Sequence, residues 1–103
     1  VEFFIDRNDN LYVNEIAPRV HNSGHLTINA YNISQFENHV RAVCKLGQVP
    51  LRKLSNAKMK NIIGDEIISY RSKEYGNGEF FFDYLKKVIK QNRKMGHLTT
   101  LLN

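Results

Sequence analysis

Two glutamates near the start of the chain have the residue type and the spacing of ligands for a metal ion. Glu2 and Glu15 each stand among apolar residues, in the stretches 1–5 and 11–16, and a polar link separates the two stretches. Aromatic and β-branched residues favour strands, and an Asn/Asp-rich link favours a turn, so residues 1–16 are predicted to form a β-hairpin. Carboxylates on adjacent strands can share Mg²⁺, a hard ion that is usually held by one or two carboxylates together with phosphates.

The register expected for this hairpin brings the two carboxylates together. With residues 7–10 as the turn and Asp6 paired with Leu11, Glu2 falls directly opposite Glu15. Opposed residues have Cβ atoms about 5 Å apart, where like charges repel unless a cation lies between them. Two alternatives remain on spacing alone: a solvent-facing pair of glutamates without a metal, or a bulge that breaks this register.

A loop rich in hydrogen-bond donors follows the predicted hairpin. Residues 17–25 read Ala-Pro-Arg-Val-His-Asn-Ser-Gly-His. Arg19 carries a planar fork of donors that suits carboxylate and phosphate, and Gly24 would let the backbone approach a ligand closely. His21 and His25 have the spacing of a zinc-binding pair, but no third ligand stands nearby, so donation to an anion is favoured over zinc. The two carboxylates and this loop together predict a metal–phosphate site.

Composition and charge narrow the class of protein. The 103 residues suggest one domain at most, and the 42% hydrophobic content without a long apolar run argues against a membrane-spanning helix. A single cysteine, Cys44, excludes an internal disulfide, fits the reducing cytoplasm and is predicted to lie in the core.

The net charge of +5 indicates an anionic ligand. Aromatic residues do not interleave with the late basic residues, which favours small phosphates over nucleic acid. Those basic residues are Arg71, Lys73, Lys86, Lys87, Lys90, Arg93 and Lys94.

The elements that must position these groups follow from local patterns. Ser34 and Glu37 form a capping box, which predicts a helix from residue 34 to a stop at Gly47, and its apolar residues are expected to pack against the sheet. That apolar face consists of Phe36, Val40, Val43 and Cys44. The remaining expectations are an irregular loop over 17–32, a strand over 58–64, a short helix within 65–75, a turn at 76–78, a strand over 79–84, a loop or short helical turn over 85–92, and a strand over 97–102.

Three sequence blocks resemble the signatures of the carboxyaminoimidazole ribonucleotide synthetase family of ATP-grasp enzymes. They are Val-Glu-Phe-Phe at the start, Val-Asn-Glu-Ile-Ala-Pro-Arg-Val-His-Asn-Ser-Gly-His from residue 13 with Ser-Gln-Phe-Glu from residue 34, and Arg-Lys-Met-Gly-His from residue 93. The resemblance implies an α+β fold, with the C-terminal part of an ATP-grasp domain over 1–47, a linker over 48–56 and a small, mostly β C-terminal domain over 57–103. It also implies that this piece alone is inactive.

The same resemblance implies roles for the first group of site residues. ATP and Mg²⁺ are the implied cofactors, with Glu2 and Glu15 as the metal ligands and Asn14 and Glu15 contacting the nucleotide. Arg19 stands at a Glu-x-x-x-Arg spacing similar to that of biotin carboxylase, where the arginine supports an anion derived from bicarbonate. The residues implied in catalysis are Arg19, His21 and Asn22.

Aminoimidazole ribonucleotide and bicarbonate are the implied substrates, and the whole protein is expected to be a cytoplasmic homodimer. The residues implied in binding the ribonucleotide are Ser23, His25, Lys86, Arg93 and Lys94. The segment before residue 93 departs from the family pattern, because Lys-Gln-Asn stands where Arg-Pro-Gly is usual. Two other functions remain as alternatives: a formate-dependent glycinamide ribonucleotide transformylase, against which the His-Asn-Ser-Gly-His and Arg-Lys-Met-Gly-His blocks argue, and a small basic nucleic-acid-binding module.

Overall fold

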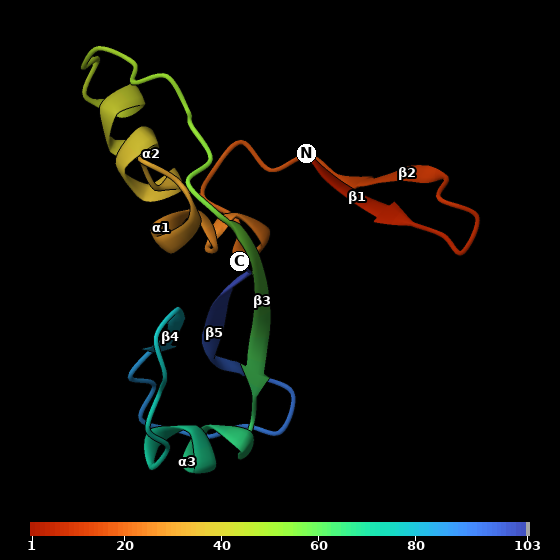
Figure 1. Ribbon diagram of the computed structural model, residues 1–103, viewed down its shortest axis with the longest axis vertical. Helices are drawn as coiled ribbons and strands as arrows, with labels where there is room; N and C mark the ends of the chain where they lie inside the picture. The colour runs from red at the N-terminus through yellow and green to blue at the C-terminus, as the bar shows by residue number, and fades with distance from the viewer. Residues whose placement is uncertain (103) are drawn as a thin grey trace.

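A hairpin, a helical segment and a three-stranded sheet follow one another along the chain (Figure 1). The computed structural model describes residues 1–102. The mixture of helices and antiparallel strands confirms the predicted α+β class. The elements are β1 (Glu2–Ile5), β2 (Leu11–Glu15), the 3₁₀ helix η1 (Asn22–Gly24), α1 (Thr27–Ala30), α2 (Gln35–Val43), β3 (Asn56–Ile63), α3 (Glu66–Arg71), β4 (Glu79–Asp83) and β5 (Lys94–Leu102).

The turn of the hairpin begins one residue earlier than predicted. Leu11 pairs with Ile5 instead of Asp6, so the predicted pairing at this end is wrong. The reason is the Asp6 carboxylate, whose Oδ1 accepts hydrogen bonds from the backbone N–H groups of Asn8 and Asn10 at 2.8 and 2.9 Å. Such a local bond between side chain and backbone mimics a turn and withdraws the residue from the ladder.

A bulge at the other end of the hairpin restores the predicted pairing of the two glutamates. Phe3 pairs with Val13, the register then shifts between Glu2 and Phe3, and Glu2 pairs with Glu15. Asn14 is therefore the extra residue on β2. A bulge bends its strand and re-aims side chains, and here it leaves both carboxylates at the open end of the hairpin.

The segment 17–32 is more ordered than predicted. It contains η1 and α1, and Ala30 at the end of α1 is fully buried. The carbonyl of Ala30 accepts hydrogen bonds from the backbone N–H groups of Leu54 and Ser55 at 2.8 and 3.2 Å. These bonds tie α1 to the extended chain that leads into β3.

The helix α2 begins as predicted and ends early. The Ser34 hydroxyl accepts a hydrogen bond from the backbone N–H of Glu37 at 3.1 Å, which confirms the N-cap. The helix ends at Val43, before the predicted stop at Gly47, because Lys45 adopts a left-handed conformation with φ of 54°. A residue in that conformation just past a helix terminates it.

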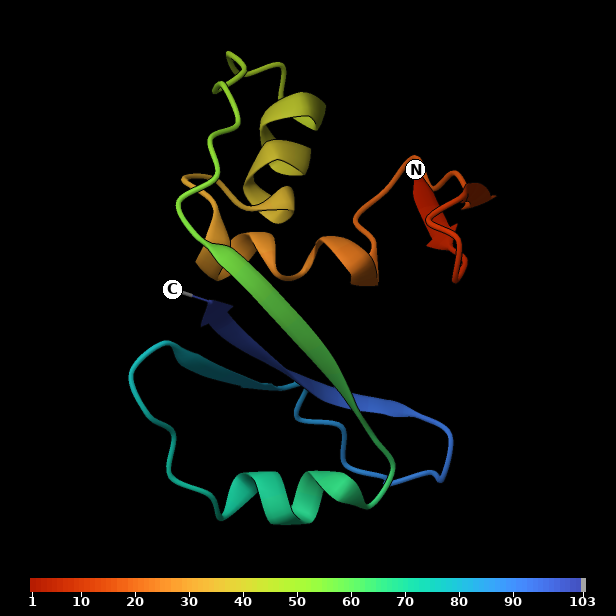
Figure 2. The same cartoon turned by 45° about the vertical axis from the view of Figure 1, so that its right-hand side comes forward.

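The apolar face of α2 does not pack against a sheet, so this prediction is wrong. Val40 and Val43 are 55% and 68% exposed, and Cys44 is exposed instead of buried. In the described chain α1 lies between α2 and the three-stranded sheet, which keeps α2 away from it (Figure 2).

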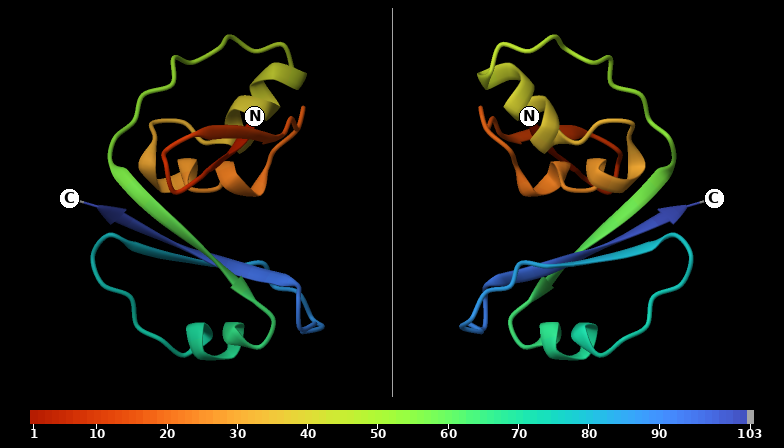
Figure 3. Two further views of the ribbon diagram at one scale, coloured as in Figure 1. Left: turned by 90° about the vertical axis from the view of Figure 1, so that its right-hand side faces the viewer. Right: turned by 90° about the vertical axis from the view of Figure 1, so that its left-hand side faces the viewer.

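The C-terminal sheet lies between α1 and α3 (Figure 3). Its strands are antiparallel in the order β3-β5-β4, and β5 starts at Lys94, earlier than the predicted residue 97. Ile67 of α3 is fully buried together with Ile62 of β3 and Met95 of β5, and the three form the core of this part. Residues 85–92 contain no helix, as predicted. Within residues 1–102, every helix is too short or too polar to cross a lipid bilayer.

Candidate functional site

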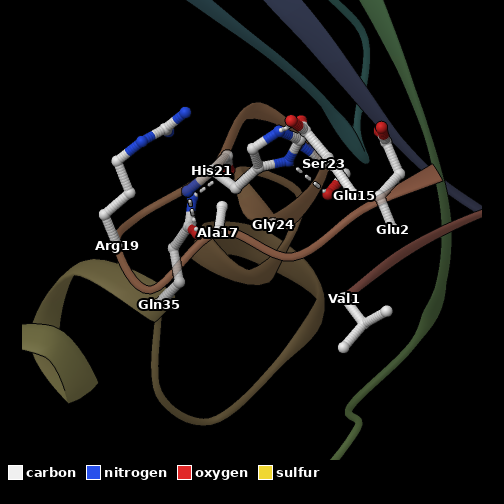
Figure 4. Close-up of a pocket in the computed structure, with 9 residues that line it drawn as sticks. All are labelled: Val1, Glu2, Glu15, Ala17, Arg19, His21, Ser23, Gly24 and Gln35. Atoms are coloured by element: carbon white, nitrogen blue, oxygen red, sulfur yellow. Dashed lines mark hydrogen bonds and ion pairs between the residues drawn. The ribbon is translucent and has the colours of Figure 1, made fainter. Parts of the chain in front are cut away.

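A pocket of about 210 Å³ lies where the hairpin meets the loop that follows it (Figure 4). Five of the predicted site residues line it: Glu2, Glu15, Arg19, His21 and Ser23. Figure 4 shows Arg19 on one side of His21 and the two glutamates on the other. Residues separated by a turn and a loop in the sequence therefore share one concave surface.

The two carboxylates and one imidazole form a compact cluster in this pocket. Glu2, Glu15 and His21 each offer one ligand atom, and these atoms lie within 4.8 Å of one another. The bulge residue Asn14 donates from its amide nitrogen to Oε2 of Glu2 at 2.5 Å and holds that carboxylate in place. Two carboxylates from adjacent strands are a donor set that fits Mg²⁺ bound jointly by protein and phosphate oxygens.

His21 is held so that it donates to Glu15. Its Nδ1 accepts the backbone N–H of Ser23 at 3.3 Å, and the Ser23 hydroxyl lies 2.8 Å from the same nitrogen. A ring nitrogen that accepts carries no proton, so the proton of the neutral ring is on Nε2. Nε2 lies 2.6 Å from Oε1 of Glu15. Ser23 therefore determines the tautomer of His21 that donates to Glu15.

Arg19 keeps most of its donors unused within residues 1–102. Its Nη1 donates to the carbonyl of Val20 at 2.9 Å, and no ion pair engages it in the described chain. A guanidinium has five N–H donors in a rigid fork. The remaining donors are available to an anion in the pocket.

A second polar group joins the loop to the C-terminal sheet. Asn22 donates to Oδ1 of Asn61 at 2.8 Å and accepts from Nζ of Lys94 at 3.1 Å. Nζ of Lys86 donates to the backbone carbonyl of Lys94 at 2.6 Å. Three predicted site residues thus meet here, while Arg93 instead donates to the carbonyl of Val88 at 3.4 Å.

His25 lies outside the pocket, in a column of rings. Its centroid is 5.2 Å from that of Phe36 and 5.3 Å from that of His97, and His97 stacks on Phe82 at 4.9 Å. Burial lowers the pKa of His25, and the nearby His21 and Lys94 lower it further.

His97 is almost completely buried in that column. It is 2% exposed, and its Nδ1 lies 2.8 Å from the hydroxyl of Tyr84. Burial, with a smaller effect of His25, lowers the pKa of His97 to about 4, and burial raises the pKa of Tyr84. The imidazole is therefore neutral at physiological pH.

Sequence reasoning missed four residues that build the site: Gln35, Asn61, Tyr84 and His97. Gln35 hydrogen bonds to both His21 and His25. An available signal was the position of Asn61 next to the buried Ile62 in β3, since a polar residue inside a strand usually has a partner. His97 belongs to the Arg-Lys-Met-Gly-His block, but nothing local indicated its burial.

Comparisons with known proteins match both parts of the chain. Residues 1–36 match the ATP-grasp domain, and residues 57–103 match the phosphoribosylaminoimidazole carboxylase C-terminal domain. The whole chain is 48% identical to 28% of the N5-carboxyaminoimidazole ribonucleotide synthase of Staphylococcus haemolyticus. The chain therefore spans 28% of the length of this curated relative.

Solved structures share the fold as well as the sequence. A N5-carboxyaminoimidazole synthetase from Staphylococcus aureus complexed with ADP is 43% identical, with a TM-score of 0.82 over 98% of this chain and 28% of that chain. A N5-carboxyaminoimidazole synthase from Aspergillus clavatus, in complex with ADP and 5-aminoimidazole ribonucleotide, is 33% identical, with a TM-score of 0.82 over 97% of this chain and 29% of that chain.

Proposed function

Because this chain belongs to the N5-carboxyaminoimidazole ribonucleotide synthase family, whose C-terminal part it matches, we propose that the whole protein carboxylates aminoimidazole ribonucleotide. In this family ATP phosphorylates bicarbonate to carboxyphosphate, and the exocyclic amine of the ribonucleotide is then carboxylated, giving ADP and phosphate. The observation that carries the proposal is the convergence of Glu2 and Glu15 in a pocket that also contains Arg19.

Glu2 and Glu15 would hold Mg²⁺ at the open end of the hairpin. When bound there, the ion would neutralise negative charge on the transferred phosphate. Asn14 orients Glu2, and the Nε2–H of His21 orients Glu15, so the carboxylates are already positioned in the described structure. Asn14 and Glu15 would also contact the nucleotide.

Arg19 would bind the carboxyphosphate anion through its unused donors. A planar fork suits both the carboxylate and the phosphate end of that species. Its position beside His21, opposite the glutamates, places cationic and metal-binding groups on either side of one cavity. Asn22 and Ser23, in the same loop, would also donate hydrogen bonds to this anion.

Lys86 and Lys94 would form a basic rim for the phosphate of the ribonucleotide, with His25 and Arg93 as further donors. Asn22 connects Lys94 to the loop over residues 17–25, so occupation of one subsite would affect the other. We also propose the boundaries 1–47, 48–56 and 57–103 for the ATP-grasp part, the linker and the C-terminal domain. A cytoplasmic location and a homodimeric whole protein remain predictions from the family.

The test is ADP release by the whole protein, measured with and without ribonucleotide and bicarbonate. Glu15→Gln keeps the size of the side chain and should abolish release that depends on both substrates. Glu37→Gln is the matched control, because Glu37 is exposed on α2 and pairs with Arg41. Near-normal turnover in Glu15→Gln would contradict the metal assignment. Release that requires formate instead of bicarbonate would indicate the transformylase alternative.

A further inference from the structure

Gln35 lies at the start of α2, and both hydrogen atoms of its side-chain amide are used in hydrogen bonds. Its Oε1 accepts the backbone N–H of His21 at 2.9 Å, and its Nε2 donates to the backbone carbonyl of His21 at 2.6 Å. Nε2 also lies 2.7 Å from Nδ1 of His25. A backbone N–H can only donate, so Oε1 must face it, and the orientation of the amide is determined. Gly24 permits this approach, since a Cβ there would lie 2.5 Å from Oε1.

This contact determines which nitrogen of His25 carries its proton. An amide nitrogen can only donate, so Nδ1 of His25 must accept and the proton of the neutral ring is on Nε2. Burial lowers the pKa of His25 and so opposes a second proton on the ring, and the nearby His21, on the same loop, and Lys94, on β5, lower the pKa further. The other neighbours are the rings of Phe36, Tyr84 and His97. Within residues 1–102, no side chain or backbone group bonds to Nε2 of His25.

We propose that Gln35 is a positioning residue that holds the His21 peptide in the pocket and keeps His25 as an Nε2–H donor for an anionic oxygen of the ligand. That this ligand is a phosphorylated ribonucleotide rests on the proposed function. The effect of Gln35 on the tautomer of His25 does not rest on the proposed function, because it depends only on contacts within this chain. Gln35 acts through the two imidazoles and does not itself touch the ligand.

The first test uses the unmodified 103-residue chain and nitrogen NMR of its imidazoles. We expect the signals of His25 at neutral pH to show an unprotonated Nδ1 and a protonated Nε2, with a pKa below that of an ordinary histidine. A protonated Nδ1 in the neutral ring would overturn the proposal without any substitution.

The second test changes the chemistry of residue 35. In Gln35→Glu a carboxylate replaces the amide that donates to Nδ1, so the charged imidazole is favoured and the pKa of His25 should rise by about one unit or more. Asn38→Asp is the matched control, since it adds the same charge one turn later on α2 at a side chain that bonds to none of these groups. An equal rise in both variants, or none in Gln35→Glu, would overturn the proposal.

A third variant covers the case in which Gln35→Glu does not fold. Gln35→Met keeps the length of the side chain without its polar atoms, and the amide fingerprint of the chain reports whether the fold is retained. Neutral His25 should then populate both tautomers. A single Nε2–H tautomer in folded Gln35→Met would refute the role of Gln35. If these results hold while the whole protein shows no carboxylation, the positioning stands and only the proposed function fails.

Discussion

His25 and His97 lie with their ring centroids 5.3 Å apart, and this contact joins the loop over residues 17–25 to the central strand of the C-terminal sheet. His97 is held on its other face by Phe82, with ring planes 18° apart, and at its edge by the Tyr84 hydroxyl. The rings pack closely because both imidazoles are neutral. A proton on His97 would place a charge on a buried ring whose Nε2 has no hydrogen-bond partner within residues 1–102.

This arrangement predicts that the chain loses stability in mild acid. The pKa of His97 falls from 6.5 in the unfolded chain to about 4 in the folded one, so the unfolded state binds more protons between these values. The stabilisation is complete above pH 6.5 and is lost as the pH falls through that window toward 4. Between pH 7.5 and pH 5 the free energy of unfolding should fall by about 2 kcal/mol from this group. Urea unfolding at pH 7.5 and at pH 5 measures this change in the free energy of unfolding.

The control for the pH experiment is His97→Phe, which keeps a ring against Phe82 and cannot titrate. The loss between pH 7.5 and pH 5 should shrink markedly in this variant, and the part that remains should come mainly from His25, whose pKa is also lowered. An equal loss in both proteins would show that His97 is not the group responsible.

Local chemistry accounts for the features that could be predicted from the sequence. The N-cap of α2 depends on Ser34 and a backbone group three residues away, so its pattern is visible in the sequence. The pairing of Glu2 with Glu15 was also predicted, although for an incomplete reason. Two differences of one residue, the earlier turn at Asp6 and the bulge at Asn14, cancel each other at that position.

Features that depend on distant contacts could not be predicted. Gln35 matters because the loop before it folds back onto its amide. The His97 ring packs against His25, which in turn packs against Phe36. The exposure of Cys44 likewise depends on where α1 lies, which no pattern within the helix reveals. Sequence periodicity identifies an apolar face but not the element that covers it.

A substitution at the end of α2 should stabilise the chain. Lys45 has a φ of 54°, and the backbone bonds from Leu46 to Arg41 at 2.8 Å and from Lys45 to Ala42 at 3.3 Å form a Schellman motif. Glycine adopts this conformation without a Cβ penalty, so Lys45→Gly should raise the free energy of unfolding by about 0.5–1 kcal/mol. Lys45→Ala keeps the Cβ and should give no such gain. Thermal unfolding of the three proteins tests this, and a destabilised Lys45→Gly would contradict it.

The hydrogen bond between Asn22 and Asn61 should couple the loop to the C-terminal sheet. The two amides are 2.8 Å apart, and both are partly buried. In a double-mutant cycle, Asn22→Ala and Asn61→Ala should show a coupling energy of about 1 kcal/mol in urea unfolding. A cycle of Asn22→Ala with Asn38→Ala is the control and should be additive. Additivity in the first cycle would mean that this bond does not link the two parts.

Gly64 should tolerate substitution poorly, because it supports the loop that carries the late cations. Its φ is 57°, a Cβ there would lie 2.5 Å from the backbone oxygen of Gln91, and its N–H donates to the carbonyl of Arg93 at 2.9 Å. Gly64→Ala therefore combines a left-handed backbone with a clash against main chain that cannot rotate away. We expect it to lower the free energy of unfolding by about 2 kcal/mol or more, and to shift the amide NMR signals of Arg93.

Gly47→Ala is the matched control for Gly64→Ala, since no heavy atom lies within 4 Å of a Cβ built at Gly47 and its φ lies outside the left-handed region. The control should change the free energy of unfolding by no more than about 0.5 kcal/mol. In the whole protein, Gly64→Ala should also weaken binding of the ribonucleotide, because Arg93 leads directly into Lys94, which reaches Asn22 across the site. Equal stability of the two variants would show that residues 85–93 yield to the added methyl group, and that Gly64 does not hold this loop in position.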